Sequence, residues 1–211
     1  MARYGVIGSG DVGKALARGL KEHGHDVRVG SRDGRKLAEW SRERGIPEGT
    51  FSDVAGHGEV VVLAVAGAVA EEVVKGVSRQ LAGKVVVDAT NPIAGPPVNG
   101  ILPFFTGPND SLLERLQRAV PAARFVKAFS CVGNALMVDP RLAGGRPTMF
   151  IAGADADAKR QVTALLDQFG WDAEDVGGVE GARAIEPLCL LWCAPGFLRN
   201  DWTHAFRVLR P

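Results

Sequence analysis

The sequence predicts an α/β protein built on a doubly wound parallel sheet. Short segments rich in Val and Ala alternate along the chain with longer segments whose apolar residues recur at helical spacing. This alternation is typical of parallel strands joined by right-handed helical crossovers. At roughly 150 residues per domain, the 211 residues allow one large core and an appendage.

The elements follow one another in a regular order. Strands are predicted at residues 4–8, 26–30, 59–65, 85–88, 125–129, 148–152 and 172–176. Helices are predicted at residues 12–20, 35–44, 69–81, 111–120, 156–169 and 182–193, with Asp110 or Ser111 as the N-cap of the fourth. A Gly- and Pro-containing segment at 139–147 predicts a seam between a first domain, residues 1–140, and a small C-terminal α/β extension, residues 141–211.

One long segment has no predicted element. Residues 92–108 contain five prolines and three glycines in seventeen positions. A loop of this length inside a small domain is more often functional or flexible than neutral.

Composition excludes several classes of protein. Apolar residues at 46% and charged residues at 23% are ordinary globular values. Twenty-five basic against 24 acidic residues leave no basic excess, so a nucleic-acid binder is not expected. Three cysteines without a C-x-x-C pair predict no disulfide framework. No membrane span or signal peptide is recognisable, so we expect a cytoplasmic protein.

The glycines after the first strand carry the functional argument. Residues 8–13 read Gly8-Ser9-Gly10-Asp11-Val12-Gly13, a G-x-G-x-x-G that follows an apolar strand and opens a helix. The first glycine permits the tight turn, the second lets the backbone approach a pyrophosphate, and the third lets helix pack on strand. We therefore expect these six residues to bind a dinucleotide.

The end of the second strand predicts which dinucleotide. An NAD site places a carboxylate there for the ribose hydroxyls, whereas this chain has Ser31 and Arg32, with Lys36 one turn later. A serine hydroxyl and a guanidinium suit a 2′-phosphate. NADP(H) is the predicted cofactor, and a solvated basic face made by Arg32 and Lys36 is the alternative.

The predicted carboxyl ends of the later strands carry small or polar residues, which suits a nicotinamide passing over them. The expected cofactor-binding residues there are Ala64, Val65, Asn91, Ala128, Phe129 and Ser130. Asn91 has two interpretations that we rate equally: a hydrogen bond to cofactor or substrate, or an Asx-turn that caps its own loop.

No acid–base catalyst is recognisable, and the catalytic residues stay unassigned. The single tyrosine, Tyr4, begins the first strand, and no Tyr-x-x-x-Lys pair is present. Cys189 and Cys193 lie four residues apart on an apolar helix and are expected in the core, so no metal site is predicted. This fits direct hydride exchange between two cofactors that the protein holds in register.

With these features the chain resembles the coenzyme F420-dependent NADP oxidoreductase family, and its fold resembles the NADPH-binding domain of the STEAP metalloreductases. The matching segments are residues 8–13, 29–32 with Lys36, 88–92, 125–129, 149–153 with Asp155, Leu165-Leu166 with Gly170-Trp171, and 182–188. The resemblance implies a Rossmann domain, NADP(H) held through Ser31, Arg32 and Lys36, and a C-terminal region that helps to bind a deazaflavin and to dimerise. Where the family shows a proline and then a bulky residue, this chain has Ala66-Gly67-Ala68, so the wall against the second ring is altered.

The leading hypothesis is an oxidoreductase that transfers a hydride between NADPH and coenzyme F420 or a flavin-like acceptor. One alternative is an NADPH-dependent reductase of a small imine, carbonyl or ferric chelate, with Glu186 or Asp201 as its acid. Another is an NADP(H) redox sensor without turnover. The apolar residues of the tail fit a homodimer seam or a domain core, and we favour the homodimer; they are Leu190, Leu191, Trp192, Phe197, Trp202 and Phe206.

Overall fold

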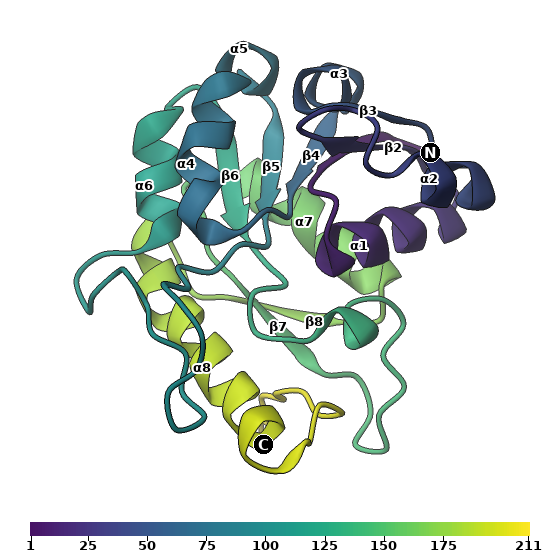
Figure 1. Cartoon of the computed structure of the whole chain (residues 1–211). Coiled ribbons are helices and arrows are strands. Elements are labelled where there is room, and N and C mark those ends of the chain that lie inside the picture. Colours follow the sequence, from purple (N-terminus) through teal and green to yellow (C-terminus); the bar gives the residue numbers. More distant parts are fainter.

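A six-stranded parallel sheet forms the centre of the protein, as the computed structural model shows for all 211 residues (Figure 1). The strands lie in the order β3-β2-β1-β4-β5-β6. Their bounds are β1 (Arg3–Ile7), β2 (Asp26–Ser31), β3 (Glu48–Thr50), β4 (Val60–Leu63), β5 (Val85–Asp88) and β6 (Arg124–Lys127). The predicted doubly wound α/β fold is confirmed.

The sheet reverses its winding direction at β1. This strand pairs with β2 on one side and β4 on the other, with Val6 in register with both Val29 and Val62. Chain segments that leave the carboxyl ends of β1 and β4 must therefore run apart, which opens a crevice at the point where ligands bind in such folds.

Helices cover both faces of the sheet because its strands are buried on both sides. One face carries α1 (Asp11–Glu22), α2 (Ala38–Arg44) and α7 (Ala156–Gln168), and the other α3 (Phe51–His57), α4 (Gly67–Gly76), α5 (Ser78–Leu81) and α6 (Leu112–Ala119). Successive β1 residues face opposite ways: Val6 packs into the first layer and Ile7 into the second.

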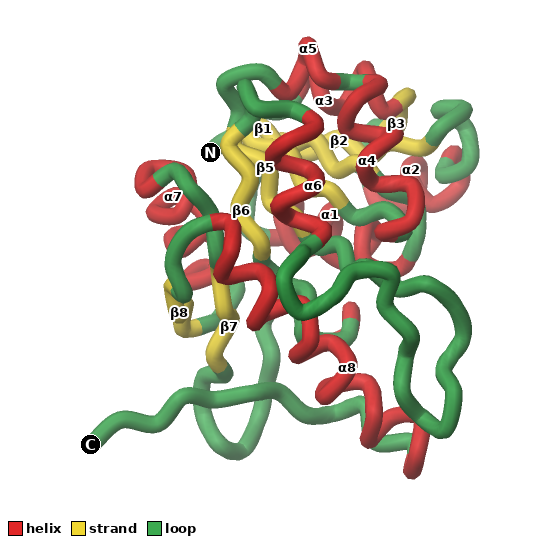
Figure 2. The backbone as a smooth tube through the Cα atoms, turned by 90° about the vertical axis from the view of Figure 1, so that its left-hand side faces the viewer, coloured by secondary structure: helices red, strands yellow, loops and turns green.

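A second, smaller sheet lies next to the end of β6, below the main sheet in the view of Figure 2. It pairs β7 (Thr148–Ile151) with β8 (Asp172–Asp175) in parallel, and α7 connects them. The Lys127 N–H donates to the Ala152 carbonyl at 2.8 Å and joins the two sheets. Met149 and Trp171 lie in the same buried cluster as Val6, so the hydrophobic core is continuous across them.

The last helix, α8 (Ala182–Arg199), lies beside the long loop at residues 92–110 (Figures 1 and 2). The remaining helical elements are two short 3₁₀ turns, η1 (Asn134–Leu136) and η2 (Val179–Gly181). Gly100 of the loop contacts the Leu198 side chain of α8. None of the helices has the length and apolarity needed to cross a membrane.

Most predicted elements lie within a few residues of their positions, and the differences have physical causes. No element is predicted at residues 48–57, but they form β3 and α3, and α3 begins with a capping box between Thr50 and Asp53. Of the two predicted caps of α6, Ser111 is the N-cap and accepts from the Glu114 N–H. Helix α8 continues past residue 193 to Arg199 with Pro195 inside it.

We predict that Trp171→Phe destabilises the protein by about 1–3 kcal/mol, the cost of leaving a buried acceptor unpaired. Trp171 is buried, and its Nε1–H donates to the Met137 carbonyl at 2.9 Å. Phe fills most of the same volume but supplies no donor. Urea denaturation measures the change. Trp40→Phe is the control, because Trp40 is only half-buried and its indole N–H makes no hydrogen bond within the chain. Equal losses in the two variants would contradict the prediction.

Candidate functional site

A cleft of about 530 Å³ opens at the carboxyl edge of the sheet, where the winding direction reverses. It brings together four chain segments that follow β1, β4 and β5 or belong to the long loop. The lining residues are Gly10, Asp11, Val12, Ala64, Val65, Ala66, Gly67, Ala89, Thr90, Asn91, Ile93, Ala94 and Gly95. Six of these are among the residues that the sequence predicts as cofactor-binding: Gly10, Asp11, Val12, Ala64, Val65 and Asn91.

The three motif glycines occupy different environments. Gly8 has φ +144°, and a Cβ there would lie 2.1 Å from the Ala64 carbonyl oxygen. A Cβ on Gly13 would lie 2.3 Å from the Gly8 carbonyl oxygen, whereas a Cβ on Gly10 would have no neighbour within 4 Å. Packing therefore requires Gly8 and Gly13, and Gly10 keeps its backbone open to the cleft.

Helix α1 presents its N-terminus to the cleft. Its N-cap is Gly10, which makes no side-chain capping bond. The first N–H groups of a helix have no partner within the helix and carry its partial positive charge. This end of α1 can therefore receive an anionic group such as a pyrophosphate.

The predicted phosphate-recognition residues lie beyond the cleft lining, at the tip of β2. Ser31 is buried, and its hydroxyl donates to Asp33 Oδ1 at 2.9 Å. The Arg35 and Lys36 N–H groups donate to the same oxygen at 3.1 and 3.2 Å. The Arg35 N–H bond, and after it the Ser31 bond, hold the pKa of Asp33 below its usual value.

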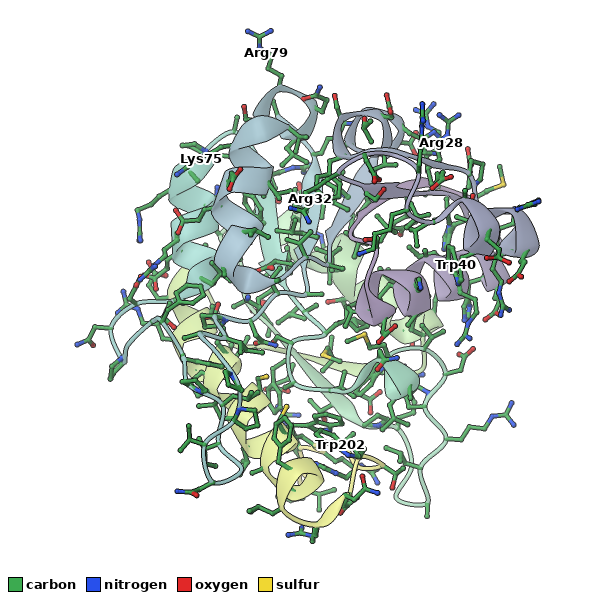
Figure 3. The ribbon with its side chains drawn as sticks, in the orientation of Figure 1. Arg28, Arg32, Trp40, Lys75, Arg79 and Trp202 are labelled. Atoms are coloured by element: carbon green, nitrogen blue, oxygen red, sulfur yellow. The ribbon has the colours of Figure 1, made fainter.

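Arg32 is exposed and makes no ion pair within the chain. In the view of Figure 3, Arg32, which directly follows β2, lies toward the middle of the molecule, whereas Arg28 within β2 lies near the outer margin. A guanidinium in this position is free to pair with an anion bound at the carboxyl edge of the sheet.

The tips of β5 and β6 are joined by side chains. Asn91 Nδ2 donates to the Ser130 carbonyl at 2.8 Å, so this amide does not cap its own loop. Asn91 Oδ1 and Ser130 Oγ are buried and have no partner. Phe129, just before Ser130, has φ +61°, a left-handed conformation that costs energy for a bulky residue. None of the predicted residues 128–130 is in the lining, and Ser130 contacts Asn91.

The lining is poor in groups that could move a proton. Asp11 is its one ionisable residue. The two acids considered as catalysts do not line the cleft: Glu186 is buried beside Lys127, and Asp201 follows α8. Burial raises the pKa of the Cys131 thiol to about 12, which keeps this cysteine protonated and unreactive.

Four further lining residues directly follow predicted strands, although they were not named as cofactor-binding: Ala66, Gly67, Ala89 and Thr90. The signal that marked them is the place where each buried strand ends. Ile93, Ala94 and Gly95 come from the long loop, and its length and proline content were the signal for a functional segment there.

Known proteins resemble this chain over part or all of its length. The family model described as NADP oxidoreductase, coenzyme F420-dependent, matches residues 3–92. A solved structure from Arthrobacter sp. FB24, whose name gives it as a candidate F420-dependent NADP-reductase, shares 33% identity with a TM-score of 0.91 and covers 100% of both chains.

Two curated relatives show the same likeness. Metalloreductase STEAP3 of Rattus norvegicus is 30% identical over 201 residues, which are 93% of this chain and 39% of that protein. The chain thus spans well under half the length of this relative. The F420-dependent NADP reductase of Methanocaldococcus jannaschii is 28% identical over 196 residues, which are 86% of this chain and 86% of that protein.

We predict that Gly10→Ala and Gly8→Ala separate binding from folding. A methyl group on Gly10 meets no neighbour within 4 Å, so it leaves the melting temperature nearly unchanged but weakens dinucleotide binding at least tenfold by blocking backbone approach. A methyl group on Gly8 collides with the Ala64 carbonyl and destabilises the fold. Thermal unfolding and calorimetric titration with NADPH measure the two effects. Unchanged binding in a folded Gly10→Ala variant would contradict the assignment.

Proposed function

We propose that this chain, which belongs to the coenzyme F420-dependent NADP oxidoreductase family, transfers a hydride between NADPH and coenzyme F420 or a flavin-like acceptor. Family membership makes it an NADP-dependent oxidoreductase. The identity of the acceptor is the new part of the proposal. The observation that carries it is a cleft at the sheet's reversal point whose lining holds one ionisable residue, Asp11.

The cleft suits NADP(H) at the phosphate end. The proposed pyrophosphate site is the turn at residues 8–13, where Gly10 opens the backbone and α1 has no side-chain cap. The proposed 2′-phosphate partners are Ser31, Arg32 and Lys36. Each hydrogen bond to a charged partner contributes about 1.5–3 kcal/mol, so two such bonds give a preference for NADP over NAD of roughly a hundredfold or more.

At the nicotinamide end the cleft has small walls and one buried polar atom without a partner, Asn91 Oδ1. Ala64 and Val65 line it, and the carbonyl of Ser130 accepts a hydrogen bond from Asn91. Asn91 Oδ1 and Ser130 Oγ are buried without partners, which is costly unless a ligand or water completes them. Of the two, only Asn91 belongs to the lining, and we assign its Oδ1 to a carboxamide or lactam edge of the bound molecules.

Bound NADPH supplies the hydride, and the residues of the chain bind, orient and exclude water. Direct hydride transfer between two cofactors requires that the protein align their two rings, but it requires no acidic side chain. Reduction of an imine or carbonyl does call for a proton donor near the reacting atom. Glu186 and Asp201 do not line the cleft, and its one ionisable residue, Asp11, lies at the start of α1, at the proposed phosphate end. The geometry therefore favours the flavin-like acceptor over that alternative.

The C-terminal region at 141–211 is proposed to support the acceptor side and to form a homodimer. Leu198 of α8 contacts Gly100 of the long loop, whose base lines the cleft. Leu191, Phe197 and Leu198 are exposed along α8, as a buried seam between two copies requires. A cytoplasmic location is part of the same proposal.

The acceptor is tested by anaerobic NADPH oxidation. We predict measurable turnover with coenzyme F420 or, failing that, with FMN or FAD, and none with a cyclic imine. Ferric chelates form a separate arm because of the likeness to a metalloreductase. Spectral change of the acceptor gives the readout. Turnover with the imine alone would overturn the proposal. A shift in oligomeric state between NADP⁺ and NADPH, without turnover of any acceptor, would favour a redox sensor.

The nucleotide preference is tested by Arg32→Ala. We predict that the dissociation constant for NADPH rises tenfold or more, since the charge-assisted bond to the 2′-phosphate is lost, while that for NADH barely changes. Calorimetric titration measures both. Arg28→Ala is the matched control, because Arg28 is also an exposed arginine but lies within β2, near the outer margin of the molecule (Figure 3). Equal losses for NADPH and NADH would refute the role of Arg32.

A further inference from the structure

Three charged side chains are buried together beneath the floor of the cleft. Asp88, Lys127 and Glu186 are each at most 1% exposed. Lys127 Nζ lies 2.6 Å from Asp88 Oδ2 and 3.0 Å from Glu186 Oε1, and it donates to the Thr90 carbonyl at 2.9 Å. Burying ions carries a large desolvation penalty, and an apolar replacement of similar volume is often more stable. The cluster therefore costs stability that a functional role would offset.

Both carboxyl groups of the cluster act only as acceptors. Asp88 Oδ1 accepts from the Thr90 N–H and hydroxyl at 2.9 and 2.6 Å. Glu186 accepts from the Leu112 and Leu113 N–H groups, at the start of α6, at 3.0 and 3.1 Å. A carboxyl group whose oxygens accept from N–H groups and an ammonium is in its ionised form.

The cluster therefore carries more negative than positive charge. Burial alone lowers the pKa of Lys127, but the attraction of Asp88 and then of Glu186 outweighs it and raises that pKa, so the ammonium stays charged. Two carboxylates and one ammonium leave one negative charge, which the N-terminus of α6 offsets by about half a unit. The nearby Arg183 pairs with Glu114 at 2.6 Å and is not available to neutralise the rest.

The cluster is one residue away from the cleft. Thr90 lines the cleft, and its own N–H, hydroxyl and carbonyl are bonded to Asp88 and Lys127. No side chain with a positive charge lines the cleft, so no cation there screens the cluster. A charge that develops on a ligand above Thr90 would feel a net negative potential through a poorly hydrated floor.

We propose that the Asp88–Lys127–Glu186 cluster stabilises the oxidised nicotinamide in the cleft and so biases the protein toward hydride donation by NADPH. The inference rests on the proposed function, which places the nicotinamide over this floor. NADPH gives up a hydride, that is two electrons and one proton, to the acceptor. Its neutral ring becomes a cation, and the acceptor takes any further proton from water. The carboxylates of Asp88 and Glu186 attract the cationic ring, and they have no comparable charge interaction with the neutral ring.

The test compares Glu186→Gln with Glu114→Gln. Both glutamates are buried, both belong to the contacts at the start of α6, and both pair with a cation, but only Glu186 belongs to the cluster. The readout is the ratio of dissociation constants for NADP⁺ and NADPH, measured by calorimetric titration of the whole chain, with thermal unfolding as the check on folding. We expect Glu186→Gln to weaken NADP⁺ relative to NADPH about three- to tenfold, and Glu114→Gln to leave the ratio unchanged.

A purely structural role would lower the melting temperature without moving the ratio. An unchanged ratio in Glu186→Gln, or the same shift in Glu114→Gln, overturns the inference. If Glu186→Gln does not fold, Asp88→Asn removes the same charge and is held to the same criterion. Lys127→Met, which leaves the carboxylates unopposed, is expected to shift the ratio in the opposite direction. Binding of neither nucleotide by the unaltered protein would instead overturn the proposed function, and this inference with it.

Discussion

The close approach of two backbones at the end of β1 determines the rest of the site. Gly8 lies against the Ala64 carbonyl and Gly13 lies against Gly8 itself, at separations that leave no room for a side chain. This packing fixes the turn on β4 and directs the N-terminus of α1 toward the cleft. The unpaired N–H groups, the open face of Gly10 and the narrow floor between β4 and β5 all follow from that contact.

Much of this arrangement could be predicted because its signals are local. Runs of valine, helical periodicity and a glycine motif are read within a dozen residues. The segment 48–57 was missed because β3 has three residues and α3 has seven, too few for periodicity to show, although the Thr50–Asp53 capping box was a local signal. The Asp88–Lys127–Glu186 cluster could not be predicted, since its members come from β5, β6 and α8 and meet only in the folded chain.

The predicted polar residues are in place, but the free protein already uses several of them. Ser31 donates to Asp33, and Asn91 donates to Ser130. A ligand that takes the Ser31 hydroxyl must replace an existing bond, so the net gain is smaller than that of a new bond. Arg32, exposed and without an ion pair, gives up nothing comparable. We therefore propose that discrimination for the 2′-phosphate rests mainly on Arg32, a point that the sequence alone could not decide.

The lack of a proton donor in the cleft limits the chemistry more than the presence of any one residue does. Every histidine lies outside the lining, and Lys127 is enclosed by its two carboxylates. A substrate whose reduction needs a proton at the instant of hydride transfer would have no donor there except Asp11 or water. An acceptor that spreads the arriving charge over a conjugated ring has no such need. In the proposed reaction, the net negative charge beneath the cleft stabilises the nicotinamide cation that remains after the hydride has left. In the proposed reaction the negative floor acts on the nucleotide, so the protein can promote transfer without contacting the atom that receives the hydride.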